Sequence, residues 1–489
     1  MFVGREKELQ ELTDRLSNRK FESVLLYGRR RIGKTELIRQ AAEQFNGTFL
    51  YFECKKSLFS DNIDGLNELL KKAFGYNSAF QSFRDVMKFI MEKSMQISIL
   101  FVLDELPFLL KENDEIIYDI RELIDEYREA TACKLIFSGS NSAIMKSLTG
   151  GDSEVKSLFT GLIELKPFDY FDAAKFYPNY RDEDKILMYS VLGGAAFYNS
   201  LIDVSLSPME NIKRLLLLPN SILQLEAEYT ISSETNNTPM LNSLIDVIGC
   251  GITKYSEITD KLTLKKNGAV NIDYLLKKLV DMEIIKKRVP INDSGNRKKH
   301  SYCFADNLMH FYFRYIFRNK NMNSILDPEV FYAEFVKEDF EARYIPQKFE
   351  EISREYLVRA SREEFITPAI EEIGTYSFDN QKKIAYRELP VVTKDKNGYI
   401  SYRCKYSDKP VNTTEIIEEE TRLQNNGSDF YRLGFISRSG FDPEIPKEKY
   451  NLVSLSELYS EKHSKESLEE AYDCFQNQYT LSGFFEKNF

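Results

Sequence analysis

What the sequence lacks narrows the classes of protein to consider. It contains no tryptophan, three histidines and six cysteines, and the cysteines are scattered without any C-x-x-C pair. This spacing argues against a disulfide framework and against a thiolate zinc site, so we expect reduced cysteines. No run of about 18 apolar residues follows the charged amino terminus, which argues against a secretory signal and a membrane span. We therefore expect a cytoplasmic protein without membrane contacts.

The size and composition are those of a globular protein with several domains. At 489 residues the chain is longer than a single hydrophobic core normally grows, and about three domains are expected. Hydrophobic residues make up 43% and charged residues 29%, which excludes a disordered chain. The net charge of -10 argues against general coating of nucleic acid but leaves room for a local basic patch.

A phosphate-binding motif lies near the amino terminus. Gly28, four residues and then Gly33, Lys34 and Thr35 follow an apolar run and precede a helical pattern. The backbone N–H groups of such a loop cradle phosphates at the start of the helix. We expect Lys34 to neutralise the β- and γ-phosphates and the Thr35 hydroxyl to bind Mg²⁺.

The positions between these glycines are less determined. Three arginines, residues 29–31, occupy variable positions, and we expect at least two of them to be solvent-facing loop residues. Further candidates for nucleotide binding are Arg31 and Ile32 in the loop and Glu36 in the following helix.

Two further apolar runs end in polar residues. Residues 99–103 form a continuous apolar run that ends in Asp104 and Glu105. Such a run indicates a buried parallel strand, whose carboxyl end is where ligands bind in an α/β sheet. Asp104 is expected to hold Mg²⁺ through water and Glu105 to polarise the attacking water, the alternative being an acidic strand cap. After residues 133–137, Ser140 or Asn141 could contact the γ-phosphate or simply form a turn.

Five sequence boxes, in order and spacing, resemble one family. They read FVGREKELQEL at residues 2–12, YGRRRIGKTELI at 27–38, FVLDELPFL at 101–109, FSGSNSAIM at 137–145 and GGAAFY at 193–198. They resemble archaeal-type ATPases of the STAND branch of P-loop proteins, which are relatives of AAA+ proteins. The resemblance covers about the first 320 residues and implies ATP and Mg²⁺ as cofactors. It also implies that Phe2, Val3, Gly4 and Arg5 lie against the adenine.

The chain departs from this family at two positions. Relatives carry an arginine before the lid that can reach the γ-phosphate, but this chain has no arginine between Arg128 and Arg181. Because such an arginine raises the rate by orders of magnitude, we expect slow hydrolysis unless Lys156, a phosphate-loop arginine or a partner supplies the charge. Ala196 stands where relatives often carry proline, and the absence of the proline ring makes the backbone less rigid there.

Residues 238–306 have the pattern of a winged helix-turn-helix. Three helical segments precede two strand-like arms around NDSGN. The third is expected to bury one face, formed by Val270, Tyr274, Leu275, Leu279 and Met282. Residues 261–300 contain eleven lysines and arginines against four acids, a local excess of seven positive charges. This concentration suits phosphate contacts with double-stranded DNA, although it also fits a solvated packing face. The candidate DNA-binding residues are Lys277, Lys278, Arg297, Lys298 and Lys299.

The carboxyl-terminal region resembles the PD-(D/E)xK nucleases without their acids. The positions matching the metal-binding aspartate and the Glu-x-Lys pair are Pro390, Arg403 and Lys405. Proline and arginine offer no carboxylate for a metal, so an inactive nuclease fold is the favoured interpretation. Glu350 remains on the preceding helix. Substitutes for the missing acids are the glutamates at 388, 415, 418 and 419.

These features together predict the architecture. We expect an α/β protein in which a parallel-sheet P-loop core, a helical lid and the winged helix-turn-helix precede the nuclease-like α/β domain. The predicted ranges are 1–165, 166–235, 236–320 and 325–460, with a helix and tail at 461–489.

The favoured function is an ATP-dependent switch that closes the lid and repositions the later domains. Open alternatives are a DNA-stimulated oligomeric ATPase, a Mg²⁺-dependent nuclease and a binding module in which ATP is structural. The expected partners are double-stranded DNA and either a protein or a second copy of the chain.

Overall fold

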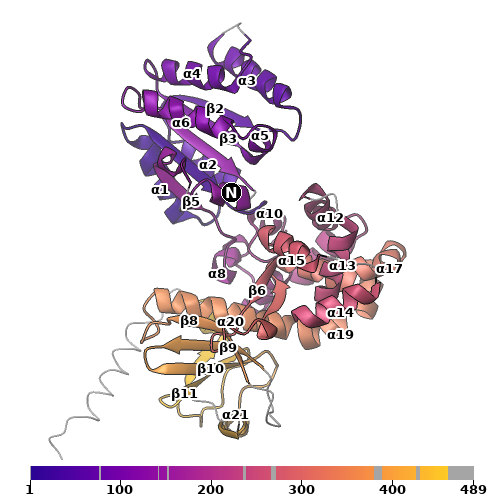
Figure 1. The fold of residues 1–489 in the computed structure, drawn as a ribbon. Helices are drawn as coiled ribbons and strands as arrows, with labels where there is room; N and C mark the ends of the chain where they lie inside the picture. Colours follow the sequence, from indigo (N-terminus) through magenta and orange to yellow (C-terminus); the bar gives the residue numbers. More distant parts are fainter. Residues whose placement is uncertain are drawn as a thin grey trace, which may run out of the picture. The chain divides into compact units, whose positions relative to one another are not determined.

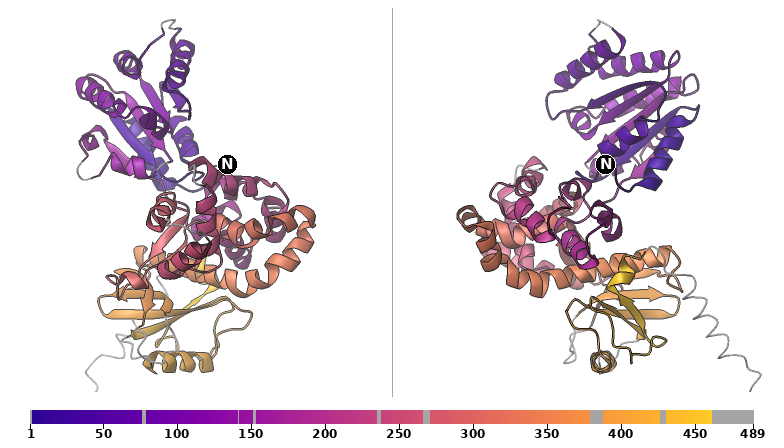
Figure 2. Two further views of the ribbon diagram at one scale, coloured as in Figure 1. Left: turned by 45° about the vertical axis from the view of Figure 1, so that its right-hand side comes forward. Right: turned by 180° about the vertical axis from the view of Figure 1, so that it is seen from behind.

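The computed structural model describes residues 2–75, 79–140, 142–150, 153–234, 238–265, 271–378, 388–425 and 430–460. Its backbone contacts divide the chain into two units (Figures 1 and 2). The first unit comprises Met1–Asn179, Val191–Lys287 and Tyr302–Phe331. The second comprises Tyr180–Ser190, Arg288–Ser301 and Tyr332–Phe489. The chain therefore passes between the units repeatedly.

A parallel five-stranded sheet with the order β2-β3-β4-β1-β5 is the centre of the first unit. Its strands are β1 Glu22–Tyr27, β2 Thr48–Glu53, β3 Ile99–Asp104, β4 Lys134–Gly139 and β5 Gly161–Glu164. Every residue of β1, β3 and β4 is buried, as expected for the central strands of a sheet covered on both faces. The predicted α/β class is confirmed.

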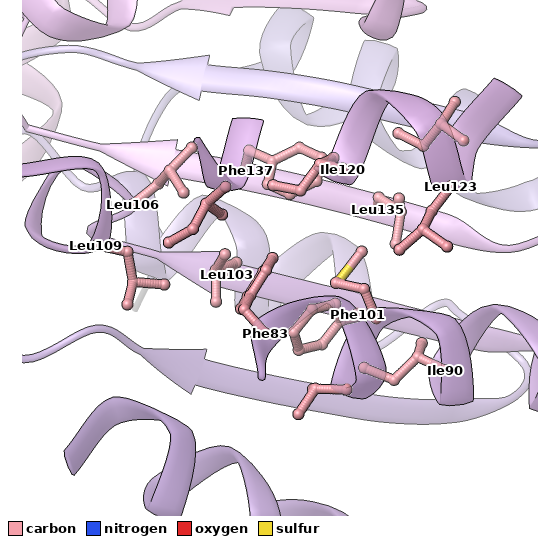
Figure 3. Packing of buried hydrophobic residues seen from close by; sticks show 14 of the residues in the cluster. Phe83, Ile90, Phe101, Leu103, Leu106, Leu109, Ile120, Leu123, Leu135 and Phe137 are labelled. Atoms are coloured by element: carbon pink, nitrogen blue, oxygen red, sulfur yellow. The ribbon is translucent and has the colours of Figure 1, made fainter. Parts of the chain in front are cut away.

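Helices cover both faces of this sheet (Figures 1 and 2). On one face, α1 Glu6–Ser17 and α2 Lys34–Ala42 pack against Val24, Leu26 and Val102. On the other, α3 Phe59–Phe74, α4 Phe83–Ser94, α5 Pro107–Glu112 and α6 Ile116–Tyr127 pack against Phe101 and Phe137 (Figure 3). Alternate strand residues face opposite sides, so one apolar run fills both cores.

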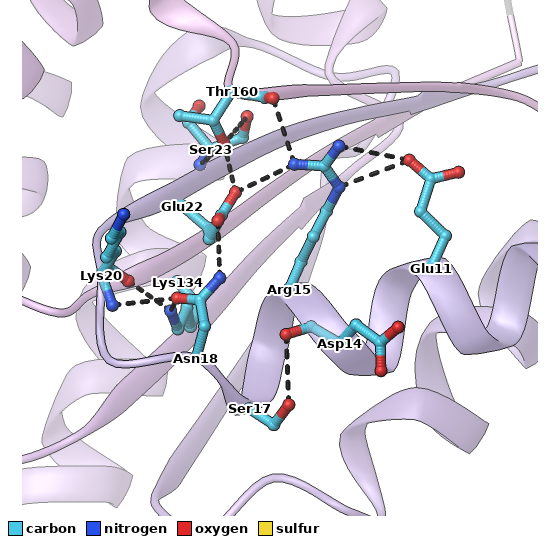
Figure 4. A network of polar contacts seen from close by, with 10 residues as sticks. All are labelled: Glu11, Asp14, Arg15, Ser17, Asn18, Lys20, Glu22, Ser23, Lys134 and Thr160. Carbon is cyan, nitrogen blue, oxygen red and sulfur yellow. Dashed lines mark hydrogen bonds and ion pairs between the residues drawn. The ribbon is translucent and has the colours of Figure 1, made fainter.

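Buried polar groups join the amino ends of the strands (Figure 4). Glu22 accepts hydrogen bonds from Asn18 at 2.7 Å and Arg15 at 3.2 Å and from the Thr160 hydroxyl. Burial raises the pKa of Glu22, but these donors outweigh it and leave that pKa lowered. Lys134, also buried, donates to Asn18 Oδ1 at 2.7 Å. The network pairs the charges that this end of the sheet buries, and ligand chemistry is left to the opposite end.

Helices dominate the rest of the first unit. The segments before residue 238 are α7 Ser142–Ser147, α8 Tyr170–Ala173, α9 Asp182–Leu192, α10 Ala196–Ser200, α11 Pro208–Ile212 and α12 Ile222–Glu234, of which α9 begins in the second unit. They are followed by α13 Thr238–Gly249, α14 Tyr255–Lys265, α15 Ile272–Asp281, β6 Ile285–Arg288, β7 Ser301–Phe304, α16 Asn307–Phe311, α17 Lys320–Ile325 and α18 Pro328–Phe331. Across the parts of the chain described, no helix combines the length and apolar character needed to cross a bilayer.

The order of three helices and a two-stranded β6-β7 sheet agrees with the sequence pattern. The predicted buried face of α15 is wrong at one position, because the Tyr274 side chain is 56% exposed whereas Leu275 and Leu279 are buried. Adjacent helical residues point about 100° apart, so a tyrosine next to Leu275 leaves the face that Leu275 shares with Leu279.

A mixed sheet with the order β12-β11-β10-β9-β8 forms the second unit together with two long helices, α20 and α21, and two short ones. The strands are β8 Glu372–Ser377, β9 Glu388–Asp395, β10 Gly398–Lys405, β11 Phe430–Ser437 and β12 Asn451–Ser454, and the helices are α19 Lys337–Asp339, α20 Ile345–Arg362, α21 Thr413–Asn425 and α22 Leu455–Leu458. Strands β10, β11 and β12 run parallel, and β8 and β9 pair antiparallel. The predicted helix and tail at residues 461–489 lie outside the described residues.

The two long helices lie on opposite faces of this sheet (Figure 1). Cys404 on β10 lies toward α20, close to Ser353 and Glu350. Its neighbour Arg403 pairs with Glu419 of α21 at 3.0 Å. Burial raises the pKa of Glu350 to about 7, against the opposing effects of Arg354, Arg288 and Arg403. The Glu350 carboxyl group is therefore largely protonated below neutral pH.

This pKa predicts how stability varies with pH. Between about pH 4.5 and 7 the folded protein holds the Glu350 proton more tightly than the unfolded chain. The free energy of unfolding should therefore fall as pH rises through this window, by about 1–3 kcal/mol. Glutamine has the shape of a protonated glutamate, so Glu350→Gln should not show this fall in the free energy of unfolding. Urea denaturation followed by circular dichroism at pH 5 and pH 8 measures the difference.

Glu388→Gln is the matched control, because Glu388 is an exposed glutamate at the start of β9. It should keep the pH dependence of the unmodified protein. An unchanged pH dependence in Glu350→Gln would contradict the assignment of that dependence to Glu350.

Candidate nucleotide site

The phosphate loop connects β1 to α2 at the carboxyl end of the parallel sheet. Gly28 has a φ of +155° and Gly33 a φ of +96°, a range that glycine adopts without steric cost. A Cβ atom on Gly28 would lie 2.1 Å from the carbonyl oxygen of Leu165, so no other residue fits there. Helix α2 begins at Lys34, and its free backbone N–H groups face this loop.

Lys34 lies inside the loop with its charge satisfied by oxygen atoms. Its Nζ donates to the carbonyl oxygens of Gly28 and Arg29, both at 3.0 Å, and to Ser140 Oγ at 3.2 Å. Burial lowers the pKa of Lys34, and the charges of Glu105 and Asp104 oppose that effect. The ammonium group thus occupies a position where phosphate oxygens could replace carbonyl oxygens as its acceptors.

Glu105 is connected to Lys34 through Ser140. Both the hydroxyl and the backbone N–H of Ser140 donate to the Glu105 carboxylate, the latter at 3.3 Å. Glu105 has a φ of +53°, which is uncommon for a residue with a side chain and is typical of functional sites. The predicted proximity of Lys34, Glu105 and Ser140 is therefore present, whereas Asn141 lies outside the described residues.

Asp104 and Thr35 form the group that would hold Mg²⁺. Thr35 Oγ1 donates to Asp104 Oδ2 at 2.9 Å, and the backbone N–H of Glu105 donates to Oδ1 at 2.9 Å. A hydroxyl and a carboxylate placed together are the oxygen ligands that Mg²⁺ takes, usually with water and phosphate oxygens completing its shell. The residues present therefore fit the ion.

Tyr51 belongs to this group, although the sequence analysis missed it. Its hydroxyl donates to Asp104 Oδ2 at 2.8 Å, and burial, with the Asp104 charge, raises the pKa of Tyr51. The strand register offers a signal, because β2 runs parallel to β3 with Glu53 opposite Asp104. Tyr51 is two residues earlier on β2, so it points to the same face as Glu53.

The opening box, residues 2–5, lies beside the phosphate loop, and its contact with adenine stays a prediction. Arg5 has a φ of +66° and donates to the carbonyl oxygens of Ile32 at 3.4 Å and Lys166 at 2.5 Å. Its guanidinium group lies 4.0 Å from the Phe168 ring centroid. Phe2 packs in the same cluster as Ile32. Val3 and Gly4 are half-buried, and Glu36 is exposed on α2.

The loop arginines contact acidic and aromatic residues of later helices. Arg29 forms an ion pair with Asp306, the residue that caps α16, and Arg31 forms a bidentate pair with Glu226 of α12 at 2.9 and 2.8 Å. Although burial lowers the pKa of Arg29, the Asp306 charge raises it overall. The expectation that at least two loop arginines face solvent is wrong for Arg29 and Arg31, because sequence alone does not bring residues 226 and 306 to the loop.

The candidate DNA-binding residues divide between the two units. Lys277 is exposed and Lys278 half-buried on α15 in the first unit. Arg297 and Lys298 are exposed in the second unit, and Lys299 forms an ion pair with Asp293 at 2.8 Å.

The nuclease-like positions hold paired charges. Arg403 contacts Glu419 at 3.0 Å and Lys405 contacts Glu415 at 2.6 Å, so both glutamates already neutralise a base. Pro390 contributes only its carbonyl oxygen, which accepts from Arg354 at 2.6 Å. Glu418 pairs with Arg422 on the same helix, at 3.4 Å. Within the described ranges, no three His, Cys, Asp or Glu side chains gather where they could hold a metal ion.

Tyr51→Phe tests the link between Tyr51 and the Mg²⁺ ligands. Removing the hydroxyl leaves Asp104 Oδ2 with one donor fewer and less fixed in orientation. We expect the Mg²⁺ concentration for half-maximal binding of a fluorescent ATP analogue to rise about tenfold, as for other partners of metal ligands. Tyr118→Phe, at an exposed tyrosine of α6, is the control. Equal Mg²⁺ dependence in both variants would remove Tyr51 from the site.

Comparisons with known proteins agree with this site. The model of a family described as an ATPase domain predominantly from Archaea matches residues 2–198. A second family, described as archaeal and bacterial proteins of unknown function, matches residues 312–417. An uncharacterized protein of Methanocaldococcus jannaschii is 28% identical over 364 residues, which cover 74% of this chain and 78% of that protein. An uncharacterized ATP-binding protein of the same organism is 46% identical over 43 residues, which cover 9% of this chain and 73% of that protein.

Solved structures with a similar fold are more distant in sequence. A Walker-type ATPase of Pyrococcus abyssi has a TM-score of 0.48 and 16% identity, covering 64% of this chain and 96% of that one. The ORC2 protein of Aeropyrum pernix has a TM-score of 0.46 and 13% identity, covering 63% of this chain and 92% of that one. The family match and the geometry of the loop together support a P-loop ATPase domain in residues 2–198.

Proposed function

We propose that the protein is an ATP-dependent switch that hydrolyses ATP slowly and controls contacts made by its later domains. The observation that carries this proposal is the attachment of the phosphate loop to distant helices. Arg29 pairs with Asp306 and Arg31 with Glu226, which lie 277 and 195 residues further along the chain. A nucleotide that rearranges the loop must also change these pairs.

The side chains around the loop account for the binding of phosphates and Mg²⁺ and for the orientation of the attacking water. Lys34 and the α2 amino terminus bind the phosphates, and the Arg5 box lies beside the loop where the base of the nucleotide is expected. Thr35 and Asp104 would hold Mg²⁺, which would neutralise charge on the β- and γ-phosphates. Glu105 orients the attacking water once the nucleotide separates it from Ser140.

The switch requires that ATP bind one arrangement more tightly than another. In the structure Lys34 donates hydrogen bonds to loop carbonyl oxygens and to Ser140, and Ser140 donates to Glu105. Phosphate oxygens compete for Lys34, and breaking this chain of contacts frees Glu105. Because Arg29 and Arg31 belong to the same loop, the free energy of that exchange also acts on their ion pairs with Asp306 and Glu226.

We infer that the outputs are contacts rather than cleavage. The segment 288–301 joins the two strands of the β6-β7 sheet but belongs to the second unit. Inside that unit, Ile291 donates to the Thr375 carbonyl oxygen at 2.9 Å, and Asn292 exchanges hydrogen bonds with Ser377 at 2.8 and 2.9 Å. Of the basic residues of the winged helix-turn-helix that we propose, Lys277 and Lys278 belong to the first unit, and Arg297 and Lys298 belong to the second.

The other functions have less support from the residues. A nuclease needs carboxylates free to hold a metal, but Glu415 and Glu419 are paired with Lys405 and Arg403. An oligomeric DNA-stimulated ATPase needs an arginine from a neighbouring copy, and nothing in the chain identifies one. A module that binds ATP only structurally would not require Glu105 beside Lys34.

Small-angle scattering tests the switch. We expect ATP and Mg²⁺ to change the radius of gyration of Glu105→Gln, which binds ATP but should hydrolyse it at least about 100-fold more slowly than the unmodified protein. In Glu226→Gln the Arg31 pair is weakened, and the ATP-induced change should shrink. An identical scattering curve with and without bound ATP in Glu105→Gln would contradict the switch. Lys34→Ala, which should not bind ATP, is the negative control.

Salt-dependent binding tests the DNA contact. The double variant Lys277→Ala/Lys278→Ala should bind duplex DNA of any sequence more weakly. The slope of log affinity against log salt concentration should be shallower by roughly one to two. The matched control is Lys71→Ala/Lys72→Ala, at exposed lysines of α3. Equal affinity of both double variants across a salt series would exclude α15 as the DNA-binding element.

A further inference from the structure

The arginine that relatives carry before the lid has no counterpart at that position of this chain. As hydrolysis proceeds, negative charge spreads over the γ-phosphoryl oxygens, and an arginine there is worth orders of magnitude in rate. No arginine occurs between Arg128 and Arg181. Lys156, a possible substitute, is exposed on the short helix Lys156–Leu158, which packs against α6. The charge has to come from elsewhere.

The phosphate loop has three arginines, and two of them are already committed. Arg29 is buried in its pair with Asp306, and Arg31 makes two charged hydrogen bonds to Glu226. Releasing either would leave a largely buried carboxylate without its partner, since the side chains of Asp306 and Glu226 are 2% and 7% exposed.

Arg30 is held differently. Among the described residues, no carboxylate lies within ion-pair distance of its guanidinium group, which instead lies 4.8 Å from the Tyr229 ring centroid. Tyr229 is itself 49% exposed on α12. A cation over a half-exposed ring is held more weakly than a bidentate ion pair, so Arg30 can leave without stranding a buried charge.

Arg30 is also close to the position of the phosphates. It directly follows Arg29 in the loop, and the Arg29 carbonyl oxygen accepts a hydrogen bond from Lys34 Nζ at 3.0 Å. Burial lowers the pKa of Lys34, and the Arg30 charge lowers it further. Lys34 is the side chain that contacts the β- and γ-phosphates in loops of this kind. A second cation beside Lys34 is unfavourable without an anion, and an anion with several charges removes that cost.

We propose that Arg30 leaves Tyr229 when ATP binds and stabilises the γ-phosphoryl oxygens during hydrolysis, in the place of the arginine missing from the segment before the lid. This role rests on the proposed hydrolysis of ATP. The water oxygen bonds to the γ-phosphorus while the bond to the β–γ bridging oxygen breaks. ADP leaves with that electron pair, and the proton of the water ends on the released phosphate. Arg30 transfers no proton and contributes charge only.

The experiment compares Arg30→Ala, Arg30→Lys and Tyr229→Leu with the unmodified protein. The matched control is Arg39→Ala, at an exposed arginine of α2. Two quantities are measured for each: the single-turnover rate of ATP hydrolysis, and the affinity for ADP with and without aluminium fluoride, which mimics the transferring phosphoryl group. ATP affinity is measured alongside with a fluorescent analogue.

In Arg30→Ala we expect the rate to fall about 100-fold or more while ATP affinity changes little, since the contact forms mainly during transfer. Aluminium fluoride should tighten ADP binding in the unmodified protein and in Arg39→Ala, and this tightening should be lost in Arg30→Ala. Arg30→Lys should recover part of the hydrolysis rate and part of the tightening by aluminium fluoride. Tyr229→Leu should keep the tightening, because it removes only the resting contact.

Tightening by aluminium fluoride that is equal in Arg30→Ala and the unmodified protein would overturn the role of Arg30 and leave the proposed ATPase switch intact. A Tyr229→Leu variant that behaves like Arg30→Ala would also overturn it, because Arg30 would then act only through its contact with α12. Failure of the unmodified protein to bind ATP or ADP would instead overturn the proposed function, and the role of Arg30 with it.

Discussion

The buried ion pair between Arg29 and Asp306 is the interaction on which the arrangement of the first unit depends. A guanidinium group removed from water needs a charged partner, because the cost of leaving it unpaired is several kcal/mol. Asp306 has a second task, since its Oδ1 accepts from the Met309 backbone N–H and caps α16. One carboxylate thus fixes both the start of a helix and the start of the phosphate loop. Neither can move far while the other stays.

The charged side chains at the phosphate loop form hydrogen bonds with neighbouring groups in two separate sets. Lys34, Ser140 and Glu105 form one continuous set of hydrogen bonds, and Thr35, Tyr51 and Asp104 form another. In the proposed switch, a triphosphate with its metal ion would change the hydrogen-bond partners in both sets at once. Such an exchange gives a coupling free energy between the loop and the helices attached to it, and that coupling must be reciprocal.

In the second unit, the basic side chains of β10 are paired with acidic side chains of α21. Arg403 pairs with Glu419 and Lys405 pairs with Glu415, at positions where the sequence comparison with nucleases led us to look for metal ligands. Converting an acid position to a base turns a site that attracts cations into a set of ion pairs. The proposed inactivity follows from this pairing, and a surface that binds a partner requires no further catalytic group.

The sequence by itself determined the elements whose signals are local. Continuous apolar runs gave the buried strands, the spacing from Gly28 to Thr35 gave the phosphate loop, and Asp104 and Glu105 followed from the end of the β3 run. Only the tertiary structure decided which distant side chains meet them: Tyr51 at Asp104, Asp306 at Arg29, and Glu226 at Arg31. It also distinguished Arg30 from the arginines on either side, which look alike in the sequence. Local patterns report how a residue relates to its own helix or strand, whereas the partner of a charge is set by packing between segments hundreds of residues apart.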